Sequence, residues 1–426
     1  MAIRDKIIKR IDEYKDKSIG ILQRLVRIPS LQGQEGDAQA FVAEMLKSIG
    51  LYVDVWEPNR MELEKHPAYI ETPWSYKGRP NVVGVLKGRG GGKSLILNGH
   101  IDVVSPEPLS LWKHDPWGAE IENGMLFGRG SLDMKGGLAA MISALKCIVD
   151  LEIRLKGDVI IESVIEEECG GPGGTLSSIL RGYRADAAII TEPTGLDSIW
   201  INSAGVLWFR VRVIGKSAHA GYAHLGVNAI GKALKIYEAL IALDEYRAKK
   251  IHNPFVEKRS PGRSVHLNVG TIRGGDWPST VAGWADLECR ISFQYPERIS
   301  EVKRQVEDQV RRAAELDPWM REHPPLVEWF GYSAEAATTS PDEPIFKTVA
   351  KIAKEIVGRE PEAAGTTVAN DLRHFILYGN MPNTILYGPG GSRPHGVDEC
   401  VSIDDYILLT KILALTIIEW CGYTES

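Results

Sequence analysis

The chain lacks several features that would place it in a specialised class of protein. Its 426 residues contain no run of about 18 uncharged apolar residues, so the sequence predicts no membrane-spanning helix. It has no block of Lys or Arg, and the formal net charge is −6. Both observations argue against nucleic acid or an anionic membrane as the main partner. The segment 1–17 is charged and has no apolar stretch that resembles a signal peptide.

Cysteine is scarce and unpatterned. The five cysteines are odd in number, scattered, and form no CxxC pair. This pattern argues against a thiolate zinc site and predicts reduced thiols in a cytoplasmic protein. No internal repeat is present, and the longest low-complexity stretch is the glycine cluster at 88–92. With 44% hydrophobic and 25% charged residues, the composition is that of a globular protein, long enough for two domains.

The first half of the chain alternates strand and helix patterns. Apolar residues recur at helical spacing over 5–28, 36–49 and 134–149, and Gly50 ends the second of these helices. Almost wholly apolar runs predict strands buried on both faces at 81–86, 94–100, 158–165 and 187–192. This alternation is typical of an α/β sheet, in which functional sites collect beyond the carboxyl ends of the strands.

The pattern changes near residue 203. The following segment predicts strands at 206–214, 265–272, 281–292 and 326–330, and helices at 226–243 and 297–315. Patterns of the first domain resume after about 335, with a strand from Thr384 and a helix from about 403. We therefore predict a discontinuous catalytic domain, 1–203 and 334–426, with an inserted α+β domain at 204–333 that could fold over the site as a lid.

Acidic and His residues gather where these strands end. They are His100, Asp102, Asp133, Glu167, Glu168, Glu192 and His395. Two imidazoles and several carboxylates suit a pair of divalent metals that share one bridging ligand. A water held between two such metals is a hydroxide-like nucleophile near neutral pH, so the set predicts a metal-dependent hydrolase.

Most members of this set are weak evidence when taken singly. His100-x-Asp102 alone fits a surface turn, Asp133 alone fits a helix N-cap, and a lone His395 before a loop is more often structural. The run 166–168 is harder to explain, because three consecutive glutamates at the end of a buried strand repel one another unless cations neutralise them. One of them can bind a metal while its neighbour acts as general base.

Six short motifs together carry a family resemblance. They are Gly99-His-Ile-Asp-Val-Val, Gly128-Arg-Gly-Ser-Leu-Asp-Met-Lys-Gly-Gly, Glu166-Glu-Glu-Cys-Gly-Gly, Thr191-Glu-Pro-Thr, Ser217-Ala-His-Ala-Gly and Gly388-Pro-Gly-Gly. In order and spacing the chain resembles the dinuclear zinc amidohydrolase and exopeptidase family of acetylornithine deacetylase, succinyl-diaminopimelate desuccinylase, aminoacylase and glutamate carboxypeptidase. The resemblance spans nearly the whole chain. It implies a zinc-exopeptidase-like mixed sheet with helices on both faces and a ferredoxin-like lid and dimerisation domain.

The resemblance also implies a role for each residue at the strand ends. Asp133 would bridge two divalent ions, zinc by preference and cobalt or manganese as alternatives. One metal would add His100 and Glu192, and the other Glu168 and His395. Glu167 would be general base and then acid, with Asp102 orienting His100. A register shifted by one would instead make Glu166 the base and Glu167 the ligand.

In the inserted domain the resemblance points to three further residues. His219 would reach the active site of the partner subunit in a homodimer and stabilise the oxyanion, while Arg290 and Asn268 would bind the substrate. The segment Asn370-Asp371 departs from the family, which usually has Thr before the Asp, so the substrate pocket is harder to predict.

Three functions remain open from sequence alone. The first is a deacylase that cleaves an N-acyl amino acid or a similar small amide. The second is a dipeptidase or carboxypeptidase with the same catalytic residues, and the third is a binding protein without turnover. The segment from Gly88 to Ser94 echoes a phosphate-binding loop, but it is one residue short and links two predicted strands.

Overall fold

The computed structural model describes residues 2–424, which fall into two compact units. The first, here called the sheet unit, comprises the described residues of Met1–Ile201, Thr338–Ala364 and Asp371–Ser426. The second, the inserted unit, comprises Asn202–Ala337 and Gly365–Asn370. No helix within residues 2–424 is long and apolar enough to cross a membrane.

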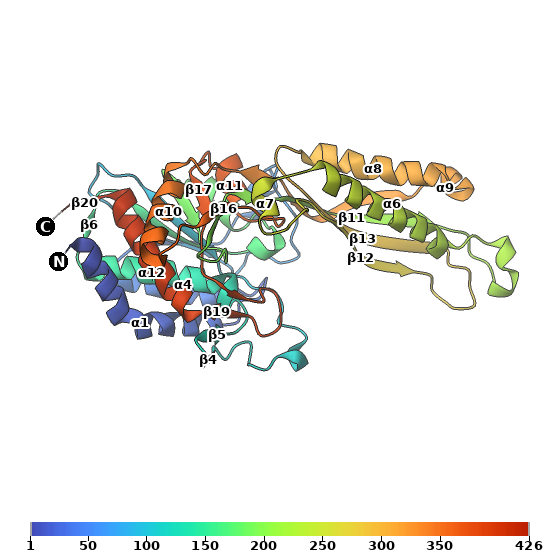
Figure 1. The fold of residues 1–426 in the computed structure, drawn as a ribbon. Coiled ribbons are helices and arrows are strands. Elements are labelled where there is room, and N and C mark those ends of the chain that lie inside the picture. The colour runs from blue at the N-terminus through green and yellow to red at the C-terminus, as the bar shows by residue number, and fades with distance from the viewer. Residues whose placement is uncertain (1, 425–426) are drawn as a thin grey trace. The chain divides into compact units, whose positions relative to one another are not determined.

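The sheet unit is built on one mixed sheet of eight strands (Figure 1). Their order is β1 (Tyr52–Trp56), β2 (Asn81–Leu86), β7 (Val159–Val164), β3 (Leu95–His100), β8 (Ala187–Ile190), β17 (Thr384–Leu386), β9 (Ser198–Trp200) and β16 (Glu362–Ala364). The strands β7, β3, β8 and β17 run parallel to their neighbours in this series. Their residues are almost all buried, as the apolar runs of the sequence predict.

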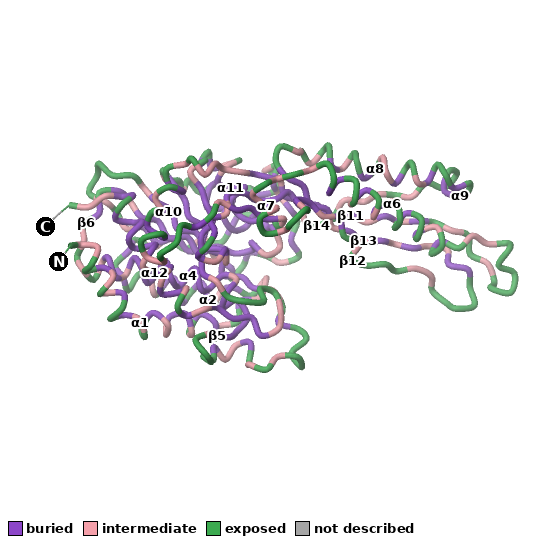
Figure 2. The backbone as a smooth tube through the Cα atoms, viewed as in Figure 1, coloured by how far each residue is buried: buried purple, intermediate pink, exposed green. Residues whose placement is uncertain are grey.

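Helices cover both faces of this sheet, which confirms the predicted α/β architecture. They are α1 (Ile3–Arg27), α2 (Gly36–Ile49), α3 (Arg60–Leu63), α4 (Gly136–Asp150), α5 (Thr175–Leu180), α10 (Pro344–Val357), α11 (Leu372–Leu377) and α12 (Ile403–Cys421). On β3, Gly99 faces Met141 of α4, while its neighbour Asn98 bonds Thr175 of α5 on the opposite face. The helices α1, α4 and α12 pack against one another, and α4 is buried along most of its length (Figure 2).

Shorter elements complete the unit. A small sheet has the order β18 (Gly391–Ser392), β19 (Cys400–Ser402), β5 (Met125–Phe127) and β4 (Ile121–Glu122), and β6 (Arg154–Leu155) pairs with β20 (Tyr423–Thr424). Three short turns of helix are η1 (Leu109–Leu111), η2 (Ser131–Lys135) and η3 (Glu167–Cys169). These elements were not predicted from the sequence, because strands of two or three residues and single helical turns are too short to show a periodicity.

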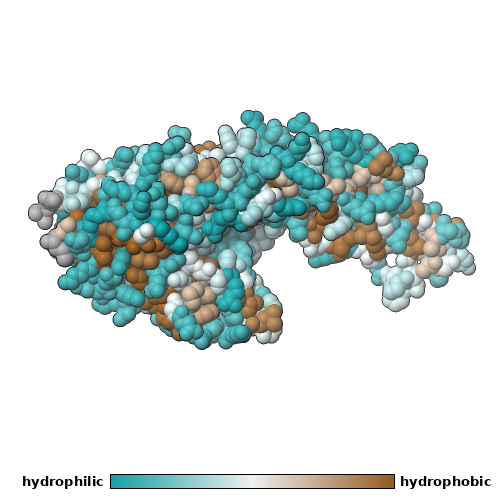
Figure 3. Space-filling model, in the orientation of Figure 1, coloured by the Kyte–Doolittle hydropathy of each residue, from teal (hydrophilic) through white to brown (hydrophobic). Residues whose placement is uncertain are grey.

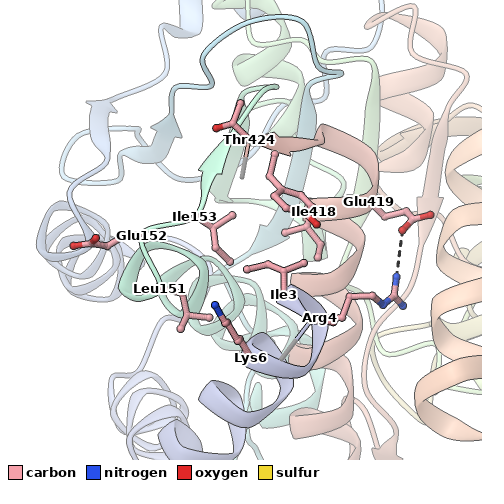
Figure 4. Close-up of a pocket in the computed structure, with 11 residues that line it drawn as sticks. Ile3, Arg4, Lys6, Leu151, Glu152, Ile153, Ile418, Glu419 and Thr424 are labelled. Carbon is pink, nitrogen blue, oxygen red and sulfur yellow. Dashed lines mark hydrogen bonds and ion pairs between the residues drawn. The ribbon is translucent and has the colours of Figure 1, made fainter. Parts of the chain in front are cut away.

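A surface pocket of about 540 Å³ lies where α1 begins and where α4 and α12 end (Figure 4). Its lining includes Ile3, Ile153 and Ile418, and an ion pair joins Arg4 to Glu419 at 3.2 Å. The 15 residues of α4 separate this pocket from Asp133 by about 22 Å at 1.5 Å per residue.

The inserted unit has a ferredoxin-like topology. Its chain order is β11 (Gly205–Ile214), η4 (Ala220–Leu225), α6 (Ala229–Lys250), α7 (Pro254–Glu257), β12 (Leu267–Gly274), β13 (Trp284–Phe293), α8 (Ile299–Glu315), α9 (Pro318–Glu322) and β14 (Leu326–Ala334). The antiparallel sheet has the order β12-β13-β11-β14, and α6 and α8 cover one face of it (Figure 1). Alternate residues such as Phe209, Val211 and Leu287 are buried beneath these helices.

The inserted unit is slightly longer than the predicted 204–333, since it begins at Asn202 and ends at Ala337, and it also includes one distant segment. The segment 365–370 lies far beyond the predicted end of the insertion at 333, yet it belongs to the inserted unit. Hydrogen bonds explain this: the Asn202 side chain accepts from the Thr366 backbone N–H, and Ser203 bonds the backbone of Asn370. The short strands β10 (Asn202–Ser203) and β15 (Ala337–Thr338) lie where the chain passes between the units.

Candidate metal centre

Three adjacent parallel strands deliver most of the predicted ligands to one edge of the sheet. His100 is the last residue of β3, Glu167 and Glu168 lie in the turn that follows β7, and Glu192 lies two residues after β8. Because β7, β3 and β8 are parallel neighbours, their carboxyl ends meet at the same edge.

Asp133 reaches the same place from a tight turn and does not cap a helix. It lies in η2, where its own backbone is not helical, and α4 begins only at Gly136 with Lys135 as its N-cap. The glycines around it allow this close packing: a Cβ on Gly137 would lie 2.0 Å from the Thr191 carbonyl oxygen. The alternative reading of Asp133 as an N-cap residue is therefore wrong.

The two carboxylate oxygens of Asp133 face different histidines. Its Oδ1 lies 3.2 Å from Nε2 of His100, and its Oδ2 lies 3.3 Å from Nε2 of His395. On the first side Glu192 Oε1 is 3.8 Å from His100 Nε2, and on the second side Glu168 Oε2 is 2.9 Å from His395 Nε2. This arrangement matches a bridging carboxylate flanked by two positions, each completed by one imidazole and one carboxylate.

The residues present fit a pair of divalent ions. Two sets of possible ligand atoms, each within 4.8 Å of one another, share His100: one adds Glu167 and Glu192, and the other adds Asp133 and Glu168. The second oxygen of Glu168 is buried and has no hydrogen-bond partner among residues 2–424, which a bound cation would remedy. The donors are nitrogen and oxygen, as zinc, cobalt and manganese accept.

Crowding of like charge perturbs the titration of these groups. Burial, and then the carboxylate of Glu192, raise the pKa of Glu167 well above its ordinary value. Burial and the Asp133 carboxylate do the same to the pKa of Glu192. The His395 imidazole hydrogen-bonds to Asp133 and Glu168, and these contacts raise its pKa to about 11. Raised pKa values show that the excess negative charge of this buried cluster favours bound protons. The same excess charge would strongly stabilise bound metal cations.

Asp102 makes a different principal contact from the predicted one. Nδ1 of His100 lies 2.9 Å from the backbone carbonyl oxygen of Asp102 and 3.7 Å from its carboxylate. The carboxylate instead accepts the backbone N–H groups of Glu167 at 3.2 Å and Glu168 at 3.1 Å. The strand ends at His100, so the predicted period-2 relation does not extend to Asp102. Asp102 therefore touches both the imidazole and the turn that carries the two glutamates.

Glu166 points away from the histidines. Its carboxylate bonds Arg79 at 2.9 Å, Tyr76 at 3.1 Å and Thr72 at 3.2 Å, and all three contacts are buried. The same guanidinium makes two bonds of 2.6 Å to Glu35. An arginine thus neutralises the first glutamate of the run, and the geometry favours the register in which Glu167 and Glu168 face the site.

The other predicted residues lie in the inserted unit. His219 is exposed, and its Nδ1 accepts the backbone N–H of Gly221 at 3.0 Å. Asn268 on β12 is directly opposite Arg290 on β13, so they share one face of the sheet. Arg290 donates to the Thr367 carbonyl oxygen at 3.1 Å. Their roles in oxyanion stabilisation and substrate binding stay predictions.

Four buried charged residues that bond the segments carrying the candidate ligands were not predicted from the sequence. They are Glu35, Arg79, Arg129 and Glu399. Each is nearly inaccessible, although a charged side chain is seldom buried without a partner. The sequence offered a signal for two of them, since Arg129 lies in the motif that contains Asp133 and Glu399 lies four positions after His395. Glu35 and Arg79 carried none.

Comparison with known proteins gives a consistent result. Residues 96–419 match the model of the family described as Peptidase family M20/M25/M40. The chain is 31% identical to the N-formyl-4-amino-5-aminomethyl-2-methylpyrimidine deformylase of Halalkalibacterium halodurans, with 100% of this chain and 99% of that protein covered.

Two solved structures show the fold. Human carnosine dipeptidase 1 superposes with a TM-score of 0.77 at 18% identity, covering 99% of each chain. The Bacillus subtilis protein YXEP, described as a dinuclear metal binding peptidase from the M20 family, superposes with a TM-score of 0.63 at 15% identity, covering 96% of this chain and 99% of that one.

Proposed function

The chain belongs to peptidase family M20/M25/M40, and from this premise we propose that it is a dinuclear metal-dependent hydrolase that removes a formyl group from a small N-formylated amine. Amide hydrolysis of the deacylase type was the leading prediction from sequence, and the deformylase relative supports it. The alignment with that relative covers the whole chain, and its name describes the deformylation of an N-formylated aminopyrimidine. We therefore propose a substrate whose formylated amine is attached to a planar heteroaromatic ring.

The single observation that carries the proposal is that the two carboxylate oxygens of Asp133 lie near two different imidazoles, those of His100 and His395. We propose that Asp133 would hold two divalent ions, together with His100 and Glu192 on its Oδ1 side and with Glu168 and His395 on its Oδ2 side. Zinc is the metal we expect, with cobalt or manganese as alternatives. The chemistry that bound ions supply is polarisation of the amide carbonyl and acidification of a water molecule.

The proton carrier we propose is Glu167. The backbone N–H of Glu167 donates to Asp102, and the preceding Glu166 is bonded to Arg79. These bonds fix the backbone of Glu167, whose carboxylate lies beside His100 and Glu192. Glu167 would take the proton of the attacking water and pass it to the departing amine. Its raised pKa suits a group that must hold that proton between the two steps.

The proposal is tested by formate and amine release from a graded panel of amides. The panel holds an N-formyl aminomethylpyrimidine, N-formyl, N-acetyl and N-succinyl amino acids, and simple dipeptides. Each is assayed after metal loading and again after chelation. We expect the formylpyrimidine to be cleaved fastest and chelation to stop the reaction. Preferential cleavage of dipeptides would replace the deformylase by the dipeptidase alternative, and no cleavage anywhere would favour a binding protein.

Replacement of the proton carrier supplies a second test. Glu167→Gln keeps the size of the side chain and removes its basicity, so we expect both metals to be retained and kcat to fall by about 10²- to 10⁴-fold. The matched control is Glu152→Gln, an exposed residue beyond the end of α4. Unchanged turnover in Glu167→Gln would contradict the assignment.

We also propose a homodimer formed through the inserted unit. The strand β12 ends the sheet and pairs only with β13 among the described residues. Next to it, α6 exposes Ile230 (38%), Leu234 (51%) and Tyr237 (40%) in a stripe at helical spacing, and β12 exposes Ile272 (49%). Figure 3 shows hydrophobic residues at the surface in this region. An unpaired strand edge beside an apolar stripe suits a second copy of the same surface.

Light scattering of the purified protein tests the dimer. We expect a dimer mass for the native chain and a monomer mass for Leu234→Asp, with Leu180→Asp on the sheet unit as the exposed control. A fully active native monomer would contradict both the dimer and the predicted role of His219 in the partner's site. For location we propose the cytoplasm, which suits five unpaired cysteines.

A further inference from the structure

Two buried charged residues lie close in sequence to candidate ligands and have no role in the proposed chemistry. Arg129 precedes Asp133 by four positions, and Glu399 follows His395 by four. Their side chains are 2% and 1% exposed, and Nη1 of Arg129 lies 2.5 Å from Oε2 of Glu399. A charge-assisted hydrogen bond thus joins two segments that are 270 positions apart in sequence.

The second oxygen of Glu399 holds the turn that carries Asp133. Its Oε1 accepts the backbone N–H groups of Leu132 and Asp133, each at 3.0 Å. The backbone carbonyl of Glu399 also accepts the N–H of Gly128 at 2.9 Å. One residue therefore fixes the turn at both ends, and the backbone of Asp133 itself is bonded to it.

The remaining donors of Arg129 hold the loop that carries His395. Its Nη2 donates to the carbonyl oxygens of His395 at 3.2 Å and Gly396 at 3.1 Å, and also to Ser105 at 3.3 Å. This loop needs support, because His395 has a φ of +60°, in the left-handed region that non-glycine residues seldom adopt. Arg393 and Asp398, in the same loop, also have positive φ values.

We propose that Arg129 and Glu399 form a positioning pair that sets the separation of Asp133 from His395, and that this pair governs occupancy of the metal position bounded by Asp133, Glu168 and His395. The inference rests on the proposed function, because it concerns one of the two proposed metal positions. It goes beyond a role in folding, because the pair bonds the backbone of both loops that carry candidate ligands and should therefore change metal affinity as well as stability. Residues that hold ligands in place typically change metal affinity by 10- to 100-fold when they are replaced.

Two substitutions separate the halves of the pair. Glu399→Gln keeps an oxygen for the turn but removes the charge that pairs with Arg129. Arg129→Lys keeps the charge, but a single ammonium cannot reach Glu399 and the three carbonyl oxygens together. The control is Asp398→Asn, which replaces the adjacent buried acid; its carboxylate accepts the backbone N–H groups of Lys113 and His114 and does not touch the Asp133 turn.

The experiment is a stepwise titration of metal-free protein with zinc against a competing chelator, together with metal counting and thermal unfolding of each metal-free protein. We expect native protein and Asp398→Asn to bind two ions alike. Arg129→Lys and Glu399→Gln should bind at least one ion 10- to 100-fold more weakly, with their metal-free unfolding temperatures within a few degrees of native, and excess zinc should restore turnover.

Two results would overturn the inference. Native affinity for both ions in Arg129→Lys and Glu399→Gln would show that the pair does not position the ligands. Equal weakening in Asp398→Asn would show a general effect of disturbing this loop. If the native protein itself bound no metal, the proposed function would fail first, so the two failures are distinguishable.

Discussion

Arg79 offers the sharpest test of how charge is arranged behind the candidate site. Its guanidinium makes two bonds of 2.6 Å to Glu35 and one of 2.9 Å to Glu166, and the three side chains are 3%, 0% and 0% exposed. Arg79→Met would leave two buried carboxylates without a counter-charge. Breaking a buried ion pair by removing one partner costs about 3–5 kcal/mol, because the remaining charge is uncompensated.

The chain contains a matched control. Arg181 also makes two bonds to one carboxylate, at 2.7 and 3.0 Å to Asp54, but its side chain is 44% exposed. The same Arg→Met change at Arg181 should cost about 1 kcal/mol or less, because water compensates the charge that remains.

Thermal unfolding measures the difference. We expect Arg79→Met to lower the unfolding temperature by roughly 10 °C and Arg181→Met by about 2 °C. Adding Glu35→Gln to Arg79→Met removes one of the stranded charges and should recover part of the loss. Similar losses in both single variants, or no recovery in the double variant, would refute the reasoning that burial of the charges sets the cost.

Two further predictions concern stability. Burial raises the pKa of Glu162 to about 7, so the stability that its protonation contributes is fully present below about pH 4.5 and is lost as the pH rises towards 7. Glu162→Gln should therefore gain up to about 3 kcal/mol of stability relative to native protein over this pH range. A difference between the two urea-unfolding midpoints that stays constant across the range would contradict this. The Asp317 side chain is 1% exposed and accepts bonds of 2.8 Å from both Lys232 and Lys235. Asp317→Asn should therefore lower the stability of the inserted unit by about 2 kcal/mol, whereas the control Glu315→Gln replaces an exposed acid. Equal unfolding midpoints for the two variants would contradict this.

The sequence predicted the main fold because its signals were local and strong. The predicted helix 36–49 and strand 81–86 match α2 and β2 residue for residue, since Gly50 supplies a left-handed C-cap and the strand is almost wholly apolar. The ferredoxin-like topology followed from the resemblance and is found in the order of β11 to β14. The segment 365–370 was assigned to the wrong unit, because its attachment depends on hydrogen bonds to Asn202 and Ser203 that no periodicity reveals.

In the candidate site, too, features set by local sequence could be predicted, and contacts between residues far apart in sequence could not. Residues at strand ends could be grouped from sequence, because adjacent parallel strands end at one edge. The contact of the Asp102 carboxylate with the turn after β7 could not be predicted, since it depends on where β3 stops. The pairing of Arg129 with Glu399 spans 270 positions, and the bonds from Arg79 to Glu35 and Glu166 span 44 and 87. Such pairs exist only once the chain has folded.

Asp133 is proposed to join two metal positions in an amide-cleaving centre. The most direct measurement of this role is hydrolysis of an N-formyl aminomethylpyrimidine by metal-free protein as zinc is added in known equivalents, with bound metal counted in parallel. We expect two ions bound per chain and activity that rises until both positions are filled. We also expect that Asp133→Ala neither binds two ions nor turns over. Full activity in metal-free protein, or two tightly bound ions in Asp133→Ala, would contradict this role.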